Sequence, residues 1–364
     1  MESLTDKYDS FDRVEHLVVV LRGIAPYRVE FFNQLYERYC HRLTIVGAAS
    51  QLPEGVNKGI GLVSVAFKER RGFRLIRNLH SVVESLKPSI VVVEFNPKVI
   101  THWLLVPWCR IKLHVPVIFW GIGAREGGAK AFALAGYAHL ANGLALYEDK
   151  ARQKIGKWLG KGYPVAVLHN TVHSEKPIIE EIRRNSVLYV GALTKRKRLD
   201  ELFRAAALLR KQKVPIELLI VGDGAERVSL ENLAEDIGIA KNVKFFGEIR
   251  DKNELREIYS QALMACCPGQ AGLFVLQAFA NGVPFVTKVN AVTGGEIENI
   301  VDGQNGVLYQ GGVDQLVEVL RLAYARPGLM EKYGKNAYEF YWAHRQVIHM
   351  VDRFVELCKR VSAT

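Results

Sequence analysis

Short runs of β-branched and aliphatic residues recur along the chain, each followed by a glycine-containing loop and then by a segment with helical periodicity. Strands that alternate with helices in this way predict parallel sheets covered on both faces. A first set of predicted strands comprises His16–Leu21, Arg42–Val46, Leu62–Ala66, Ile90–Glu94, Val115–Trp120, Leu144–Tyr147 and Val165–Leu168. A second set comprises Ser186–Val190, Ile216–Val221, Val243–Phe245, Leu263–Cys266, Pro284–Val286 and Val307–Leu308. Two sets predict two doubly wound α/β domains.

The charged stretch His173–Arg184 separates the two sets. It predicts an N-terminal domain over residues 1–174 and a C-terminal domain over residues 185–344, and the length of 364 residues fits two domains. In open α/β sheets, ligands bind beyond the carboxyl ends of the strands. The loops that follow strands are therefore expected to carry the chemistry and to face a cleft between the domains.

Composition narrows the class of protein. Hydrophobic residues at 49% and charged residues at 24% are close to globular averages, which excludes collagen-like, coiled-coil and disordered chains. The five cysteines form no C-x-x-C pair and lie mostly in apolar runs, as reduced thiols do. The acidic N-terminus does not resemble a secretory signal, and no apolar run approaches the roughly 18 residues that cross a bilayer. A cytoplasmic protein is expected.

The formal net charge is +11, and residues 1–180 hold 24 Lys and Arg against 16 Asp and Glu. This excess favours an anionic partner, which could be nucleic acid, a phosphorylated substrate or a membrane surface. Nucleic acid is not expected, because no recognition motif accompanies the charge. Lys68–Arg77 interleaves cations with apolar residues and Trp103–Trp108 adds two Trp, which predicts contact with the inner face of the cytoplasmic membrane. A solvated basic helix and buried Trp are the alternatives.

Three loops after strands contain glycine. Gly222-Asp223-Gly224 follows one strand and precedes a predicted helix over Ser229–Ile237, and Gly121–Gly128 contains Arg125. Both could approach an anionic ligand, but both lack the third glycine of a dinucleotide fingerprint, so a simple turn and a flexible loop remain alternatives. The loop Arg22–Arg28, with Gly23, precedes a predicted helix over Val29–Tyr36 and is expected to reach the cleft.

Four consecutive cations, Lys195–Arg198, lie after a predicted strand and before a predicted helix over Leu199–Leu209. A solvated face is one interpretation, and a diphosphate clamp is the other. The chain has no D-x-D triplet to hold a divalent metal and its His residues lack metal-ligand spacing, so Lys and Arg would have to neutralise a diphosphate themselves. No metal and no cofactor are expected.

The stretch Ala265–Val286 contains a strand, a Pro/Gly loop, a helix of small and apolar residues that Asn281-Gly282 ends, and a further strand. With Gly222-Asp223-Gly224, Asn242–Gly247 and the glycine-rich stretch Gly294–Gly306, it resembles the donor-binding signature of the retaining glycosyltransferases of family 4. The resemblance covers residues 186 to about 310. It implies two Rossmann-like domains facing a cleft, the GT-B fold, and a final helix over Arg345–Val361, within 345–364, that returns to the N-terminal domain.

The resemblance also implies roles for single residues. Lys197 and Arg196 would stabilise the leaving diphosphate, and Glu94 is expected to contact the acceptor. Donor-binding residues are expected at Gly23, Gly222, Gly224, Phe246, Gly272, Leu273 and Gln277, and acceptor-side residues at Arg28 and Arg125.

Several positions depart from the family's pattern. Gly269 and Gln277 stand where two Glu usually mark the donor loop, Ala192 replaces an Arg, and Ile122 lies where a His is expected.

The sequence thus predicts a retaining, metal-independent glycosyltransferase that takes a nucleotide-sugar donor. Its acceptor would be a saccharide or a lipid-linked sugar in the assembly of a bacterial surface polysaccharide such as O-antigen, capsule or exopolysaccharide. The missing Glu pair leaves a catalytically inactive binding protein of the same fold as one alternative. An NAD-dependent oxidoreductase is the other, since two glycine loops follow strands.

Overall fold

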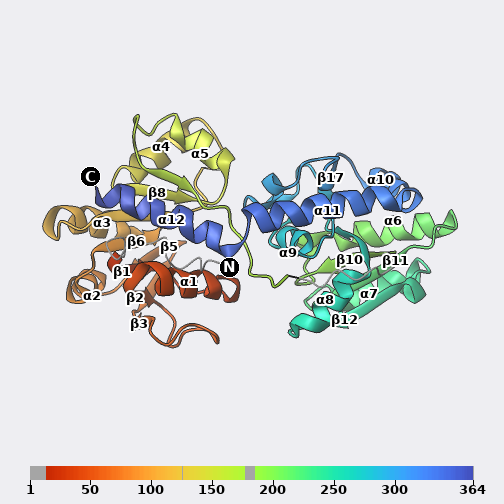
Figure 1. Cartoon of the computed structure of the whole chain (residues 1–364), viewed down its shortest axis with the longest axis horizontal. Coiled ribbons are helices and arrows are strands. Elements are labelled where there is room, and N and C mark those ends of the chain that lie inside the picture. Colours follow the sequence, from red (N-terminus) through yellow and green to blue (C-terminus); the bar gives the residue numbers. More distant parts are fainter. Residues whose placement is uncertain (1–13, 125, 177–184, 364) are drawn as a thin grey trace, which may run out of the picture. The chain divides into compact units, whose positions relative to one another are not determined.

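The computed structural model describes residues 14–124, 126–176 and 185–363, and the chain forms two compact units (Figure 1). The first unit contains the residues up to His173 together with those from Val347 onward, and the second extends from Ser174 to Gln346. The expected first domain ended at 174 and the final helix began at 345, close to these limits, whereas the C-terminal domain was expected to begin at 185 and the second unit begins at Ser174. Residues 177–184, most of the stretch expected to join the domains, lie outside the described residues.

The first unit is built on a parallel sheet of seven strands in the order β3-β2-β1-β6-β7-β8-β9. These strands are β1 (Val14–Val20), β2 (Cys40–Gly47), β3 (Gly61–Ser64), β6 (Ile90–Glu94), β7 (Val117–Gly121), β8 (Gly143–Leu146) and β9 (Val165–Val167). Its helices are η2 (Pro26–Arg28), α1 (Val29–Tyr39), α2 (Leu79–Leu86), α3 (Ile100–Lys112), α4 (Ala129–Ala138), α5 (Asp149–Gly156) and α12 (Val347–Ser362).

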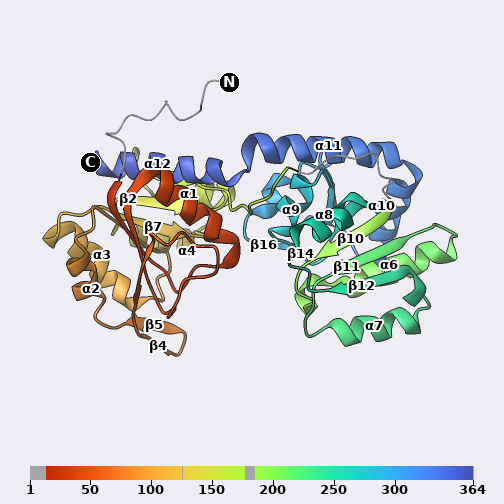
Figure 2. The same ribbon diagram turned by 60° about the horizontal axis from the view of Figure 1, so that its bottom comes forward.

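Successive residues of each central strand enter two different cores, which explains why the strands are continuously apolar. Val18 and Val91 pack in the core that α2, α3, α4 and α5 cover. Leu17 and Val92 pack in the opposite core, which α1 and α12 cover. Figure 2 shows α1 and α12 along the same face of this sheet, where the Tyr39 hydroxyl donates a hydrogen bond to Asp352 (2.7 Å). The last helix therefore belongs to the core of the first unit.

A basic segment that could have been a solvated helix is an antiparallel hairpin instead, formed by β4 (Phe67–Arg70) and β5 (Phe73–Ile76). Arg71 and Gly72 make its two-residue turn with positive φ angles of 51° and 78°. Such turns match the twist of paired strands. The hairpin is attached to the start of α3, because the Arg74 amide donates to the carbonyl of Lys98 (2.8 Å).

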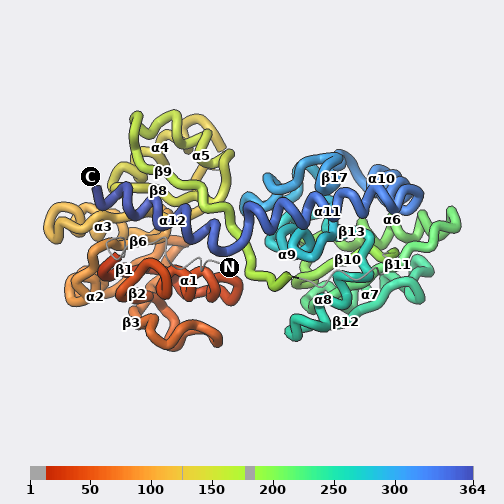
Figure 3. The backbone as a smooth tube through the Cα atoms, viewed as in Figure 1, coloured from red at the N-terminus to blue at the C-terminus, as the bar shows by residue number. Residues whose placement is uncertain are grey.

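The second unit contains a six-stranded parallel sheet in the order β12-β11-β10-β13-β15-β17, and Figure 3 shows β10, β11, β12 and β13 side by side. Its strands are β10 (Ser186–Val190), β11 (Glu217–Val221), β12 (Val243–Gly247), β13 (Ala262–Cys266), β15 (Phe285–Lys288) and β17 (Gly306–Tyr309), with a separate pair β14 (Gln270–Ala271) and β16 (Val292–Thr293). Its helices are η3 (Lys195–Lys197), α6 (Leu199–Lys211), α7 (Arg227–Asp236), η4 (Ala240–Asn242), α8 (Lys252–Ser260), α9 (Phe274–Ala280), η5 (Glu296–Asn299), α10 (Val313–Ala325) and α11 (Pro327–His344).

No helix among the described residues is long and apolar enough to cross a membrane. All five cysteines are buried and free.

Candidate functional site

The loops after β10, β11 and β12 meet at the carboxyl edge of the sheet in the second unit. The Leu193 amide donates to the carbonyl of Asp223 (2.9 Å), and the Gly222 amide donates to the carbonyl of Gly247 (2.6 Å). Gly222 and Gly224 have φ angles of 119° and 156°, and a Cβ on either would lie under 3 Å from a backbone oxygen of the neighbouring loop. The two loops can therefore approach each other only with glycine at both positions. This is the role that the simple-turn alternative gives to these glycines. Whether they also face a nucleotide stays a prediction.

The cations after β10 differ in their surroundings. Lys195 and Arg196 are exposed, whereas Lys197, at the end of η3, is partly buried. Burial lowers the pKa of Lys197, as does the charge of Arg196, while Cys267 and Glu296 act in the opposite direction. A partly desolvated ammonium forms stronger charge-assisted contacts than a fully hydrated one. Lys197 is thus the residue of this run best placed to hold an anion.

The last cation of this run belongs to a chain of ion pairs whose other members the sequence did not predict. Arg198 adopts a left-handed conformation (φ 55°) and pairs with Glu201 on α6. Glu201 in turn pairs with Lys288 on β15, with Nζ and Oε2 2.6 Å apart and both side chains buried. Glu201 and Lys288 are 87 residues apart, and nothing in their local sequence indicates a partner.

The loop after β13 packs directly against the cation loop. The Gly269 amide donates to the carbonyl of Lys197 (3.0 Å), and a Cβ at position 269 would lie under 3 Å from the carbonyl oxygen of Arg196 and 2.7 Å from Cγ of Arg198. The position where family members carry a Glu therefore has no room for a side chain in this chain.

The other predicted donor residues of the second unit lie on β12 and on or just before α9. Gly272 and Leu273 precede α9, whose seven residues give it only a short dipole. Gln277 is partly exposed on α9, and Phe246 lies in β12 with the Lys244 ammonium 5.9 Å from its ring. Next to this loop, the buried carboxylate of Glu296 accepts a hydrogen bond from the Gly294 amide (2.9 Å).

In the first unit, three predicted residues line a single cavity of about 950 Å³ at the carboxyl ends of β1, β6 and β7. They are Gly23, Arg28 and Glu94. Arg125 lies outside the described residues, although the preceding Gly121–Gly123 also lines this cavity. Ile122, at the place expected for a His, is exposed here.

Arg28 is the most enclosed of these residues, with only 8% of its surface exposed. Its guanidinium lies 4.6 Å from the ring centre of Trp120 and 4.8 Å from that of Tyr147, and Nη2 donates to Oδ1 of Asn170 (3.1 Å). The sequence signalled Arg28 through its loop but not its aromatic surroundings, because Trp120 and Tyr147 are distant in sequence.

Glu94 is held in place by its neighbours. Its Oε1 accepts a hydrogen bond from Asn96 (2.9 Å), and its Oε2 lies 3.5 Å from Nη1 of Arg74. His102 is buried behind it, with Nδ1 3.2 Å from the Glu94 carbonyl oxygen. The carboxylate thus lines the cavity as half of an ion pair.

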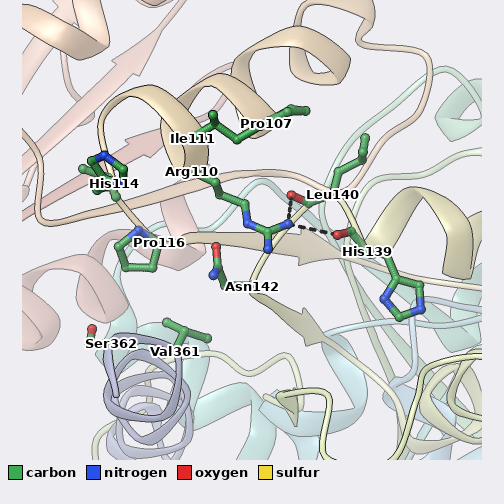
Figure 4. A pocket seen from close by; sticks show the side chains of 11 residues that line it. Pro107, Arg110, Ile111, His114, Pro116, His139, Leu140, Asn142, Val361 and Ser362 are labelled. Atoms are coloured by element: carbon green, nitrogen blue, oxygen red, sulfur yellow. Dashed lines mark hydrogen bonds between the residues drawn. The ribbon is translucent and has the colours of Figure 1, made fainter. Parts of the chain in front are cut away.

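A second cavity, of about 520 Å³, lies at the amino ends of β7 and β8 (Figure 4). Arg110 lines it, but its Nη1 already donates to the carbonyls of His139 (3.1 Å) and Leu140 (2.7 Å) and so holds the end of α4. Within the ranges that the structure describes, no group of three or more His, Cys, Asp or Glu side chains could hold a metal ion. The predicted site residues described above lie instead at the carboxyl edges of the two sheets.

Comparison with known proteins finds relatives among glycosyltransferases. Residues 174–340 match the family described as glycosyl transferases group 1. The chain is 31% identical over 152 residues to the putative glycosyltransferase EpsD of Bacillus subtilis, covering 41% of this chain and 39% of EpsD. It is 30% identical over 168 residues to the lipopolysaccharide glucosyltransferase WaaG of Escherichia coli, covering 46% and 44%. The chain thus spans less than half the length of these relatives.

Solved structures extend the likeness to the whole fold. HepE of Anabaena, solved in complex with UDP, superimposes with a TM-score of 0.72 at 14% identity, covering 95% of this chain and all of that one. The GT-B fold and the resemblance to glycosyltransferases are confirmed.

Proposed function

We propose, since residues 174–340 carry a group 1 glycosyl transferase domain, that the chain transfers a glycosyl residue from a nucleotide-sugar to a saccharide or lipid-linked acceptor with retention of configuration. The main support is the partly buried Lys197 in the loop after β10, whose carbonyl accepts a hydrogen bond from the Gly269 amide in the loop after β13. HepE, of the same fold, was solved with UDP, so a UDP-sugar is the first donor to test. Similarity to the lipopolysaccharide glucosyltransferase WaaG favours a role in surface polysaccharide assembly.

In the proposed reaction, the bond between the anomeric carbon and the diphosphate oxygen breaks, and a bond from that carbon to the acceptor oxygen forms on the same face. Lys197, Arg196 and the amides of Gly272 and Leu273 would stabilise the charge that develops on the diphosphate. The proton of the acceptor hydroxyl goes to the leaving phosphate. No metal would take part, because these cations neutralise the diphosphate.

The proposal also gives the chain a cytoplasmic location at the inner membrane face. On α3, Ile100, Trp103, Leu104 and Ile111 form an exposed apolar stripe, named here the α3 stripe. The hairpin attached to the start of α3 carries exposed Phe73 and Leu75 among Lys68, Arg70, Arg71 and Arg77. Apolar side chains rimmed by cations suit an anionic lipid surface.

Substitution of Lys197 by Ala tests the leaving-group assignment. We expect the rate of transfer from a UDP-sugar to fall, because the loss of a charge-assisted contact removes about 2–4 kcal/mol of transition-state stabilisation. Lys195→Ala, which removes an exposed cation of the same run, is the matched control and should stay near wild-type activity. Excess EDTA should leave the rate unchanged.

Three results would contradict the proposal. Wild-type turnover by folded Lys197→Ala would remove the assignment of this residue, and complete inhibition by EDTA would refute the metal-free mechanism. A chain that binds UDP-sugars but transfers and hydrolyses none of them would instead be the inactive binding protein of this fold.

A further inference from the structure

The guanidinium of Arg28 is only half satisfied by the protein. Nη2 donates to Asn170, but Nη1 is buried and has no hydrogen-bond partner among the described residues. The faces of Trp120 and Tyr147 favour the positive charge but do not accept in-plane N–H hydrogen bonds. A buried donor without a partner is destabilising, and buried polar groups in native proteins are nearly always paired with a protein group, a water or a ligand. Arg28 also lines the larger cavity of the first unit.

The charges around that cavity are unbalanced. Arg22, Arg74 and Lys98 line it together with Arg28, whereas Glu94 is the acidic side chain that lines it. Glu94 is engaged by Arg74 and Asn96, so its carboxylate does not neutralise Arg28. The cavity therefore combines a buried, unsatisfied donor with an excess of positive charge.

We infer that this cavity binds an oxyanion carried by the acceptor, a phosphate or a carboxylate, with Nη1 of Arg28 as its buried donor. This inference rests on the proposed function for the existence of an acceptor, and it adds the chemical class of that acceptor. A planar guanidinium suits an oxyanion, since its donors match two oxygens at once. The location also fits, because ligands of open α/β sheets bind beyond the carboxyl ends of strands.

A purely structural Arg28 is the competing explanation, and the two differ in what they require. If Arg28 only holds Asn170 and packs on Trp120, these contacts do not depend on whether Nη1 has a hydrogen-bond partner. The cavity would then bind charged and neutral sugars equally well. An anion subsite requires that preference, and requires that it depend on Arg28 and on Arg22, an exposed cation of the same cavity.

The test measures binding of sugar probes to the full chain by ligand-observed NMR in excess UDP, which occupies a donor diphosphate site. D-Glucuronate and D-glucose 6-phosphate are compared with D-glucose, so that the carboxylate and the phosphate are tested separately. We expect at least one anionic probe to bind about tenfold or more tightly than glucose, as one charge-assisted hydrogen bond provides. Arg28→Lys, which keeps the charge but loses the planar fork, and Arg22→Gln should each reduce this preference several-fold.

Arg38→Gln, on the exposed surface of the same helix region, removes an equal charge outside the cavity and should leave the preference unchanged. Thermal unfolding shows whether each variant is folded. If Arg28→Lys does not fold, the result with Arg22→Gln decides the test. Equal binding of glucose and both anions, or a preference that survives in folded Arg28→Lys and Arg22→Gln, would overturn the inference. UDP binding is recorded in the same samples: its absence alongside a retained anion preference would refute the proposed donor and leave the subsite standing.

Discussion

At the scale of the residue, Gly269 decides whether the family's usual donor loop can be rebuilt. We expect Gly269→Ala to destabilise the protein by about 1–3 kcal/mol, because its Cβ would push against the backbone of Arg196 and displace Lys197. UDP affinity should fall as well, since Gly269 also holds the Lys197 carbonyl. Chemical denaturation and calorimetry with UDP measure the two effects.

Gly272→Ala is the control for this prediction, because the nearest atom to its Cβ would be Nε2 of Gln270 at 3.7 Å, an ordinary contact. If Gly269→Ala were as stable as Gly272→Ala and bound UDP normally, this would contradict the close contact described between the loop after β13 and the cation loop.

His102 predicts how stability depends on pH. Burial lowers its pKa to about 4, against about 6.5 in an unfolded chain, and the Glu94 carbonyl offsets this only in part. The folded state therefore disfavours the protonated ring: the full stability is present above pH 6.5, and about 3 kcal/mol is lost as the pH falls to 4. His102→Gln should flatten the profile of unfolding free energy over this range, while His41→Gln, an exposed His, should not. If the unfolding free energies of wild type and His102→Gln changed with pH in parallel, this would contradict the role given to His102.

Single residues were predictable where local sequence carries the signal and not where a partner is remote. A cation run after a strand pointed to Lys197, and a glycine-proline loop pointed to Arg28. The partners of Arg28 and Glu201 could not be predicted, since Asn170 and Lys288 lie 142 and 87 residues away. Only the folded sheets bring these residues together.

At the scale of the element, the alternation of apolar runs with helical segments predicted the parallel strands well. Strands that are buried on both faces consist of consecutive apolar residues, which are easy to recognise in the sequence. The hairpin β4–β5 was missed because its strands are short and mostly exposed. A run of cations there masks the pairing, which depends on the left-handed turn at Arg71 and Gly72. β14 and β16 were missed for a similar reason, since each has only two residues.

The ion pair between α6 and β15 gives a prediction at this scale. Glu201→Gln should lower the free energy of unfolding by about 3–5 kcal/mol, because it leaves the buried ammonium of Lys288 without its counter-charge. The double variant Glu201→Leu, Lys288→Met removes both charges and should recover most of that loss. Urea denaturation of wild type, Glu201→Gln and the double variant measures these free energies of unfolding. A double variant less stable than Glu201→Gln would show that the pair contributes net stability.

At the scale of the whole molecule, the exposed apolar and basic surface of the first unit predicts binding to anionic vesicles. Leu104 and Ile111 of the α3 stripe are 68% and 72% exposed, so Leu104→Ser with Ile111→Ser should leave the fold intact and weaken flotation with liposomes. Val228→Ser, an equally exposed apolar position on α7, is the control. Binding should increase with anionic lipid and fall with salt, at roughly 1 kcal/mol for each basic side chain near the surface. Absence of flotation at low salt with anionic lipid would favour a soluble acceptor.

The return of α12 to the first unit also sets an order of folding during synthesis. Phe354 on this helix packs 5.7 Å from the ring centre of Trp120 and 5.8 Å from that of Phe31, so the part of this face that α1 does not cover stays exposed until residues beyond Val347 have been made. The second unit is contiguous from Ser174 to Gln346 and has all of its residues earlier. Chains emerge from the ribosome amino end first, yet here the unit that begins the chain is the last that can complete its core. Until then the nascent protein exposes the apolar face around Trp120, which is the stage at which chaperones would be needed most.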